Sequence, residues 1–308
     1  MLDLETLRLI WWLLLGILLI GFAITDGFDL GLAVLFPVVA KTDLEREVVL
    51  STIRPIWEGN QVWIIAAAGS IFAAWPLVYA VSFSVFYFII LLLLLTLGIS
   101  RPVSFKYRNK LKNSLWRSVW DRAIFIGGLF PSLIFGFLIG NVMQGLPFHF
   151  DEQLRISYEG SFWDLFNPFA GWCAFTSLVM LVMHGGIYLA IKTEAPLAPR
   201  ALHYAKWSAA ILILLFAGGS YWLAYQVKGY TLTSFVSPQG FANPLHKEVV
   251  KELGAWLHNY SLYPLILIAP SLGLLSPLLV ILSAQVQALK LAFVCSALSI
   301  IGIISSVG

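Results

Sequence analysis

Apolar residues recur along the chain in long runs that short polar connections separate. A helix that crosses a membrane needs about 20 apolar residues, and windows of that length follow one another through the whole sequence. Pro76 disfavours helix in the residue that precedes it, so a tight connection should separate the second window from the third. The pattern predicts eight spanning helices, at residues 9–37, 53–75, 77–99, 123–143, 168–191, 207–225, 262–282 and 289–307.

Composition points to the same class of protein. Hydrophobic residues make up 59% of the chain and charged residues 11%, and the mean hydropathy is +0.86. Soluble domains average roughly 25% charged residues, so these values predict an all-α, polytopic integral membrane protein, for which we expect no nucleic-acid partner. Cys173 and Cys295 lie in separate apolar runs, which excludes a disulfide framework, a CxxC redox pair and a CxxCH haem attachment.

The distribution of Lys and Arg predicts the orientation, because cytoplasmic loops carry the excess of these residues. The segment 101–122 is strongly basic, whereas the next connection, between the fourth and fifth expected spans, is acidic. We therefore expect loop 101–122 in the cytoplasm and the N-terminus outside. Asp3 and Glu5 near the N-terminus agree with this orientation and argue against a cleaved signal peptide, which would begin with a basic region.

Acidic residues interrupt the first two apolar runs. Asp26 and Asp29 lie in the first expected span, and Glu58 lies near the start of the second. An acid at the bilayer centre costs at least about 2.5 kcal/mol on insertion scales, so each of these groups is by default a functional-site hypothesis. With a rise of about 1.5 Å per residue, the three acids and Arg101 come to one depth in the inner third of the membrane. We interpret them as a polar inlet open to the cytoplasm.

Two roles remain open for this cluster. Arg101 can fully compensate only one carboxylate, so a second acid nearby would be left able to gain and lose a proton. On this reading Asp26 and Glu58 transfer protons. The alternative is structural: Asp29 could pair with Arg101 only to lock helices together. The neighbours with supporting or purely structural roles are Trp57, which could desolvate Glu58 and hold its geometry, and Asn60 and Gln61, which could hydrogen-bond between helices.

Several strings in this order resemble subunit II of the cytochrome bd-type quinol oxidases. They are Leu-Arg-Leu-Ile-Trp-Trp at 7–12, Gly-Phe-Ala-Ile-Thr-Asp-Gly-Phe-Asp at 21–29, Pro-Ile-Trp-Glu-Gly-Asn-Gln-Val-Trp at 55–63, Phe-Ala-Ala-Trp-Pro at 72–76 and Arg-Pro-Val-Ser-Phe-Lys-Tyr-Arg at 101–108. Shorter matches follow at 140–148, 167–169 and 243–250, so the resemblance covers essentially the whole chain. Asp26 and Glu58 fall on the family's intramembrane acid positions, and some members carry Asp in place of Glu58.

The resemblance implies a single membrane domain, 1–308, built from two four-helix bundles at 1–143 and 168–308. Members of the family continue to a ninth helix, so we expect this sequence to be a fragment. The implied function is that of a subunit of a respiratory terminal oxidase in the bacterial inner (cytoplasmic) membrane, which oxidises quinol and reduces O2 to water. The implied partner is subunit I, which is required for activity and holds the b and d haems. A small accessory single-helix subunit, membrane lipids and a structural quinone are further implied partners.

The histidines give no reason to place a haem in this chain. His184 is the one histidine within an expected span. Met180 lies four residues before it on the same helix face, and two groups on one face cannot ligate an iron from opposite sides. We expect no metal or cofactor ligand in this chain, and we interpret His184 as a hydrogen-bonded polar group or a side branch of the proton route.

A proton-coupled secondary transporter or channel is the alternative function, because it would use the same intramembrane acids. Such proteins often contain inverted repeats and a substrate site at the membrane midplane. Here the polar cluster lies toward one face, and residues 168–307 contain no counterpart of the acid pair. This one-sided arrangement favours a subunit that passes protons to a partner.

Overall fold

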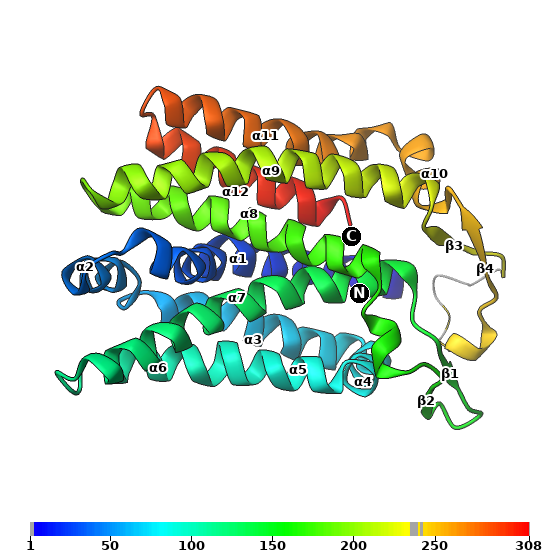
Figure 1. Cartoon of the computed structure of the whole chain (residues 1–308). Coiled ribbons are helices and arrows are strands. Elements are labelled where there is room, and N and C mark those ends of the chain that lie inside the picture. Colours follow the sequence, from blue (N-terminus) through cyan, green and yellow to red (C-terminus); the bar gives the residue numbers. More distant parts are fainter. Residues whose placement is uncertain (1–2, 235–239, 241–242, 308) are drawn as a thin grey trace.

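The computed structural model describes residues 3–234, 240 and 243–307 (Figure 1). Long helices lie side by side along one axis, and short elements close the two ends. The long helices are α1 (Leu4–Val39), α3 (Trp57–Ala74), α7 (Ser114–Gln144), α8 (Pro168–Lys192), α9 (Leu197–Tyr225), α11 (Ile268–Gln285) and α12 (Leu289–Ser305). The expected class, a mostly helical multi-pass membrane protein, is confirmed.

The described residues contain fewer long apolar helices than the eight expected spans. Within the described residues, six helices are long and apolar enough to cross a membrane, at Leu4–Val39, Tyr87–Tyr107, Ser114–Gln144, Pro168–Lys192, Leu197–Tyr225 and Pro264–Gln285. The α3 helix and α4 (Pro76–Val85) pass the same test only as a bent pair, and α12 has 17 residues. The eight expected spans therefore stay a prediction.

The third span differs from its expected bounds of 77–99. The chain bends by 116° between α3 and α4, because Pro76 begins a new helix and lacks the N–H that would continue the old one. The apolar helix comes later, as α5 (Tyr87–Leu93), the π-helical η1 (Leu94–Ser100) and α6 (Arg101–Tyr107). The expectation that Arg101 begins a loop was wrong, since this residue lies inside a helix that continues to Tyr107.

Helix α8 lies at the centre of the packing. The α1 and α7 helices contact one side of it, and α9 and α12 contact the other. Glycine permits the closest crossings: a Cβ on Gly31 of α1 would lie 1.8 Å from the carbonyl oxygen of Leu181 in α8, and one on Gly185 would lie 2.5 Å from the backbone nitrogen of Leu32. Small residues at a crossing let helix backbones approach, which is how helices associate in lipid.

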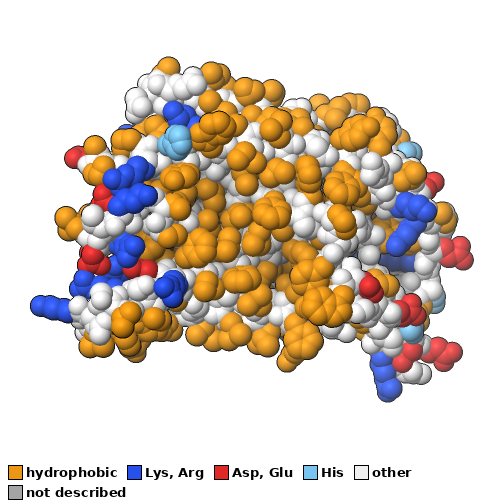
Figure 2. Space-filling view, viewed as in Figure 1, with side chains coloured by type: hydrophobic (Ala, Val, Ile, Leu, Met, Phe, Trp, Pro, Cys, Tyr) orange, Lys and Arg blue, Asp and Glu red, His pale blue; other side chains and the backbone are white. Residues whose placement is uncertain are grey.

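The two ends of the molecule differ in charge and in structure. One end carries α2 (Asp43–Ile53), the turn after α6 and the α8–α9 and α11–α12 connections, and we call it the basic end. Figure 2 shows Lys and Arg side chains gathered there, with hydrophobic side chains over the middle of the molecule. The opposite end holds two short hairpins that the sequence did not predict. Its elements are β1 (Phe148–Phe150), β2 (Ile156–Tyr158), η2 (Phe162–Leu165), β3 (Lys228–Leu232), η3 (Pro244–His246), β4 (Val249–Leu253), α10 (Ala255–Leu262) and η4 (Pro264–Leu267).

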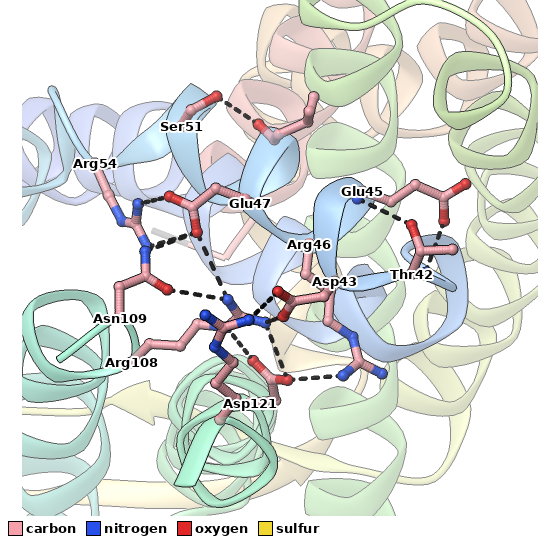
Figure 3. A network of polar contacts seen from close by, with 12 residues as sticks. Thr42, Asp43, Glu45, Arg46, Glu47, Ser51, Arg54, Arg108, Asn109 and Asp121 are labelled. Atoms are coloured by element: carbon pink, nitrogen blue, oxygen red, sulfur yellow. Dashed lines mark hydrogen bonds and ion pairs between the residues drawn. The ribbon is translucent and has the colours of Figure 1, made fainter. Parts of the chain in front are cut away.

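An ion network fastens α2 to the helix ends beside it (Figure 3). Arg108, which is only 1% exposed, donates from Nε to Asp121 at 2.5 Å and from Nη2 to Asp43 at 2.7 Å. Arg46 of α2 also binds Asp121, at 2.8 Å. Charge-assisted hydrogen bonds of this kind are stronger than neutral ones. The network therefore joins α2 to both α7 and the end of α6.

Two acids of this region, Asp43 and Glu47, have lowered pKa values. Partial burial alone would raise the pKa of Asp43, but the hydrogen bond from Arg108 and the positive charges around it outweigh burial and bring the pKa below its usual 3.8. The pKa of Glu47 is likewise lowered from 4.5, because hydrogen bonds from Arg54 and Asn109 outweigh the effect of burial. Both carboxylates are ionised at neutral pH.

We expect Gly31→Ala to destabilise the protein strongly, because the new methyl group would overlap the backbone of α8. Gly16→Ala is the matched control on the same helix, since nothing lies within 4 Å of a Cβ at Gly16. Thermal unfolding of the purified protein should show a lower midpoint for Gly31→Ala and an unchanged or higher midpoint for Gly16→Ala. Equal midpoints for the two variants would contradict the close crossing.

The ion network should make stability depend on pH. A folded-state pKa below the unfolded value stabilises the protein above the unfolded pKa, and the effect disappears as the pH falls through the folded pKa. Asp43→Asn should therefore lower the unfolding midpoint at pH 7, by an amount equivalent to about 1 kcal/mol for this half-exposed group. The difference from the unsubstituted protein should shrink below pH 4. A difference that is constant with pH would argue against the network.

Candidate functional site

A fully buried ion pair joins the first apolar helix to the third. Arg101 in α6 donates from Nη2 to the Oδ1 atom of Asp26 in α1 at 2.6 Å, and neither side chain is exposed. Removing charges from water is costly, and a pair compensates this cost only when it is close and well hydrogen-bonded. Asp26 and Arg101 are therefore expected to hold α1 and α6 in a fixed register.

A second buried acid lies three residues further along the same helix. The Oδ2 atom of Asp29 accepts a hydrogen bond from Nδ2 of Asn60 in α3 at 2.9 Å. Residues three apart in a helix share a face, so Asp26 and Asp29 point toward the same region. The structure thus brings four predicted residues together from α1, α3 and α6: Asp26, Asp29, Asn60 and Arg101.

Several polar atoms of this cluster have no protein partner. Among the described residues, nothing hydrogen-bonds to Oδ2 of Asp26, to Oδ1 of Asp29 or to Nε and Nη1 of Arg101. Buried polar atoms are nearly always hydrogen-bonded, to protein or to ordered water. Two carboxylates also face a single guanidinium, so one acid has no compensating cation in the cluster. Such an arrangement leaves polar atoms whose hydrogen bonds ordered water would complete.

The backbone directly before Arg101 is π-helical, a rare form that is frequent at functional sites. The N–H of Arg101 bonds to the carbonyl of Thr96, five residues earlier, at the end of η1. Gln61 of α3 donates to the neighbouring carbonyl of Leu97 at 3.2 Å. Gly127 of α7 makes room for this segment, since a Cβ there would lie 2.9 Å from Cβ of Arg101. Sequence reasoning missed the role of Gly127, for which the Gly-Gly pair at 127–128 was the available signal.

Glu58 lies apart from the buried cluster. Its side chain is 67% exposed, and its nearest cation is Lys106 of α6, with Nζ 3.6 Å from Oε1. In this chain taken alone, the first turn of α3 directs Glu58 outward, and its proton-transfer role stays a prediction. Trp57 is buried against Phe105, with ring centroids 5.7 Å apart, so the two neighbours take different sides of α3. The pairing of Asp29 with Arg101 was wrong, since the guanidinium binds Asp26.

His184 forms a separate polar contact at the junction of α1, α8 and α12. Its Nδ1 atom lies 2.7 Å from Oγ of Ser296, and its Nε2 atom lies 2.9 Å from the carbonyl oxygen of Ile24. The ring also stacks on Phe293, with centroids 4.7 Å apart. Both ring nitrogens are engaged with protein oxygen atoms, so the residue does not fit a haem iron. A carbonyl oxygen accepts only, which requires the proton on Nε2.

Comparisons with known proteins agree with one another. A family model described as "Cytochrome bd terminal oxidase subunit II" matches residues 7–308. The "Probable cytochrome oxidase subunit 2" of Haemophilus influenzae is 45% identical over 304 residues, which are 99% of this chain and 80% of that protein. The "Cytochrome bd-I ubiquinol oxidase subunit 2" of Escherichia coli is 44% identical over 308 residues, 100% of this chain and 81% of that protein.

A solved structure supports the fold independently. The bd oxidase from Geobacillus thermodenitrificans contains a chain that superposes with a TM-score of 0.69 at 14% sequence identity. The match covers 98% of this chain and 83% of that one. At so low an identity the likeness concerns the arrangement of helices alone.

The buried pair predicts a double-mutant result. Arg101→Gln should destabilise the protein by about 3 kcal/mol or more, because it leaves the carboxylate of Asp26 buried without its cation. Adding Asp26→Asn should recover much of this loss, since neither charge then remains. Unfolding free energies of the two single variants and the double variant measure the coupling. Additive losses would show that the two side chains do not interact.

Proposed function

Because the chain belongs to the cytochrome bd terminal oxidase subunit II family, we propose that it conducts protons from the cytoplasm toward the haem-bearing subunit of a respiratory quinol oxidase. The chain is a subunit of a membrane-bound oxidoreductase and works with a partner subunit I. The observation that supports proton conduction is the buried cluster in which two acids share one arginine and leave oxygen atoms without partners.

The proposed route begins at the basic end, which we assign to the cytoplasm because of its Lys and Arg residues. Glu58 stands exposed there and can exchange protons with water. Asn60 lies two residues further along α3, about 3 Å along the helix axis, and binds the buried Asp29. Protons would pass from Glu58 through water to the carboxyls of Asp29 and Asp26, with Arg101 fixing the second. Trp57 and Gln61 hold α3 against α6 and η1 along this path.

The redox chemistry lies outside this chain in the proposal. Subunit I would hold the haems, which would supply the electron transfer from quinol to O2. Each reduced oxygen atom must then receive protons, which is the step that a carboxyl route in this chain would supply. His184 lies inside α8, and its two ring nitrogens already bind Ser296 and Ile24. A structural quinone, a single-helix accessory subunit and lipids complete the proposed assembly.

We further propose that the chain crosses the bacterial inner membrane eight times, with its N-terminus outside. The α3 helix with its bent continuation α4, and the shorter α12, would add to the six long apolar helices. Contacts within each half support two four-helix units, although α8 also packs against α1 and α7. The α1, α3, α5–α6 and α7 helices pack together within residues 1–143, and α8, α9, α11 and α12 pack together within residues 168–308.

The proton route predicts selective loss of turnover. Glu58→Gln should leave the haem spectrum of the purified oxidase unchanged and slow O2 consumption at least tenfold, because an amide cannot carry the proton. Asp26→Asn should slow turnover similarly if the complex still assembles. Lys106→Gln is the matched control, since it removes the ion-pair partner of Glu58 but keeps the carboxyl.

Three outcomes separate the alternatives. Normal turnover in Glu58→Gln would remove this residue from the route, and equal slowing in Lys106→Gln would assign the effect to the ion pair. Loss of haem in either acid variant would indicate a structural role at that position. Purification through a tag on this chain tests whether it is an oxidase subunit. A haem-free chain that transports solute without a larger partner would overturn the oxidase assignment.

A further inference from the structure

A cleft at the basic end has no role in the proposed proton route. It has a volume of about 400 Å³ and lies between the end of α1 and the first turns of α9. The residues that line it are Val38, Lys41, Pro199, Arg200, His203 and Tyr204. Three of these side chains are basic, and none belongs to the buried acid cluster.

The arginine of this cleft is held in a fixed position. The Nη1 atom of Arg200 donates to the carbonyl oxygen of Val39, the last residue of α1, at 3.0 Å. The same atom lies 3.0 and 3.1 Å from the two carboxylate oxygens of Glu45. The side chain still has 34% of its surface exposed. A guanidinium placed in this way is preorganised, so little freedom is lost when it binds an anion.

Glu45 offsets the positive charge of Arg200 but not that of Lys41. Its carboxylate accepts hydrogen bonds from the backbone N–H groups of Lys41, at 2.5 Å, and Thr42, at 3.2 Å. These bonds, with the one from Arg200, hold the pKa of Glu45 below its usual value. The oxygen atoms are therefore engaged with Arg200 and the backbone. Within the described residues, the ammonium group of Lys41 forms no ion pair and remains available to a ligand.

An apolar strip continues from the cleft toward the middle of the molecule. Its exposed side chains on α9 follow helical spacing: Tyr204 (37% exposed), Trp207 (61%), Ile211 (43%) and Leu214 (72%). Val38 of α1 flanks the strip at the cleft and is 39% exposed. Tyr and Trp rings favour the level of the lipid headgroups, which places this cleft at the membrane surface.

We propose that this cleft binds the phosphate headgroup of an anionic phospholipid, with the acyl chains lying along Trp207, Ile211 and Leu214. Basic pockets between helices on the cytoplasmic side suit such headgroups. Lys41, Arg200 and His203 supply the donors for the phosphate oxygens. Free phosphate would meet the same donors, but it would gain nothing from the strip beside them. The continuity of cationic cleft and apolar strip therefore favours the lipid.

Quenching of Trp207 by brominated lipid tests this proposal in the complete oxidase. The complex is placed in phosphatidylcholine nanodiscs that contain a minor fraction of either brominated phosphatidylglycerol or brominated phosphatidylcholine. The signal of Trp207 is taken as the difference from a Trp207→Phe complex. Brominated phosphatidylglycerol should quench Trp207 at a lower mole fraction than brominated phosphatidylcholine, by about fivefold for each cation that contacts the headgroup.

Substitutions locate the effect in the cleft. Lys41→Gln combined with His203→Gln should remove most of the preference for the anionic lipid and leave Arg200 at the end of α1. Lys112→Gln, an exposed basic residue of the same end outside the cleft, should leave the preference unchanged. The haem spectrum reports whether each complex is assembled.

Three results would overturn the proposal. Equal quenching by the two brominated lipids in the unsubstituted complex would show only bulk lipid beside Trp207, and this comparison needs no variant. An unchanged preference in an assembled Lys41→Gln, His203→Gln complex would place the anionic lipid elsewhere. Loss of the preference on adding inorganic phosphate, at constant ionic strength, would indicate a site for free phosphate.

Discussion

The structure depends on keeping two carboxylates inside a helix that lies in an apolar environment. An isolated acid is expensive at membrane depth, and it is tolerated only with a partner or beside water. Here α6 supplies the guanidinium of Arg101 for Asp26, and α3 supplies the amide of Asn60 for Asp29. Each helix of the cluster therefore has a partner that fixes its rotation. Moving α1 by one residue would separate both pairs at once.

Close helix contacts are what allow these short polar side chains to meet. The amide of Asn60 reaches Asp29, and Arg101 reaches Asp26, only because α1, α3 and α6 pack tightly. Gly127 lets α7 press against the backbone around Arg101, and Gly31 lets α1 press against α8. In lipid the apolar surfaces gain little by associating with one another, so packing and hydrogen bonds must hold the bundle together. The polar cluster and the close glycine contacts therefore both hold the helices together.

The sequence predicted the components of the cluster better than their pairing. Composition and hydropathy were sufficient for the membrane class, and the rarity of intramembrane acids identified Asp26 and Asp29. The choice between them as the partner of Arg101 depends on helix rotation, which a π-helical turn at residues 94–100 shifts. A single π turn leaves no clear mark on a continuous apolar run. Pro76 indicated where the helix breaks after α3. It did not indicate the direction of the next helix, which turns by 116°.

The exposure of Glu58 affects its place in the proposed proton route. A carboxyl that is 67% exposed in this chain is not desolvated by the chain itself, so it resembles an entry point more than a buried relay. Asn60, two residues further along α3, binds the buried Asp29, and one oxygen of each buried acid has no hydrogen-bond partner among the described residues. If the partner subunit covers Glu58, burial of its carboxyl would be a property of the complex. The entry of the proposed route would then be complete only in the assembled oxidase.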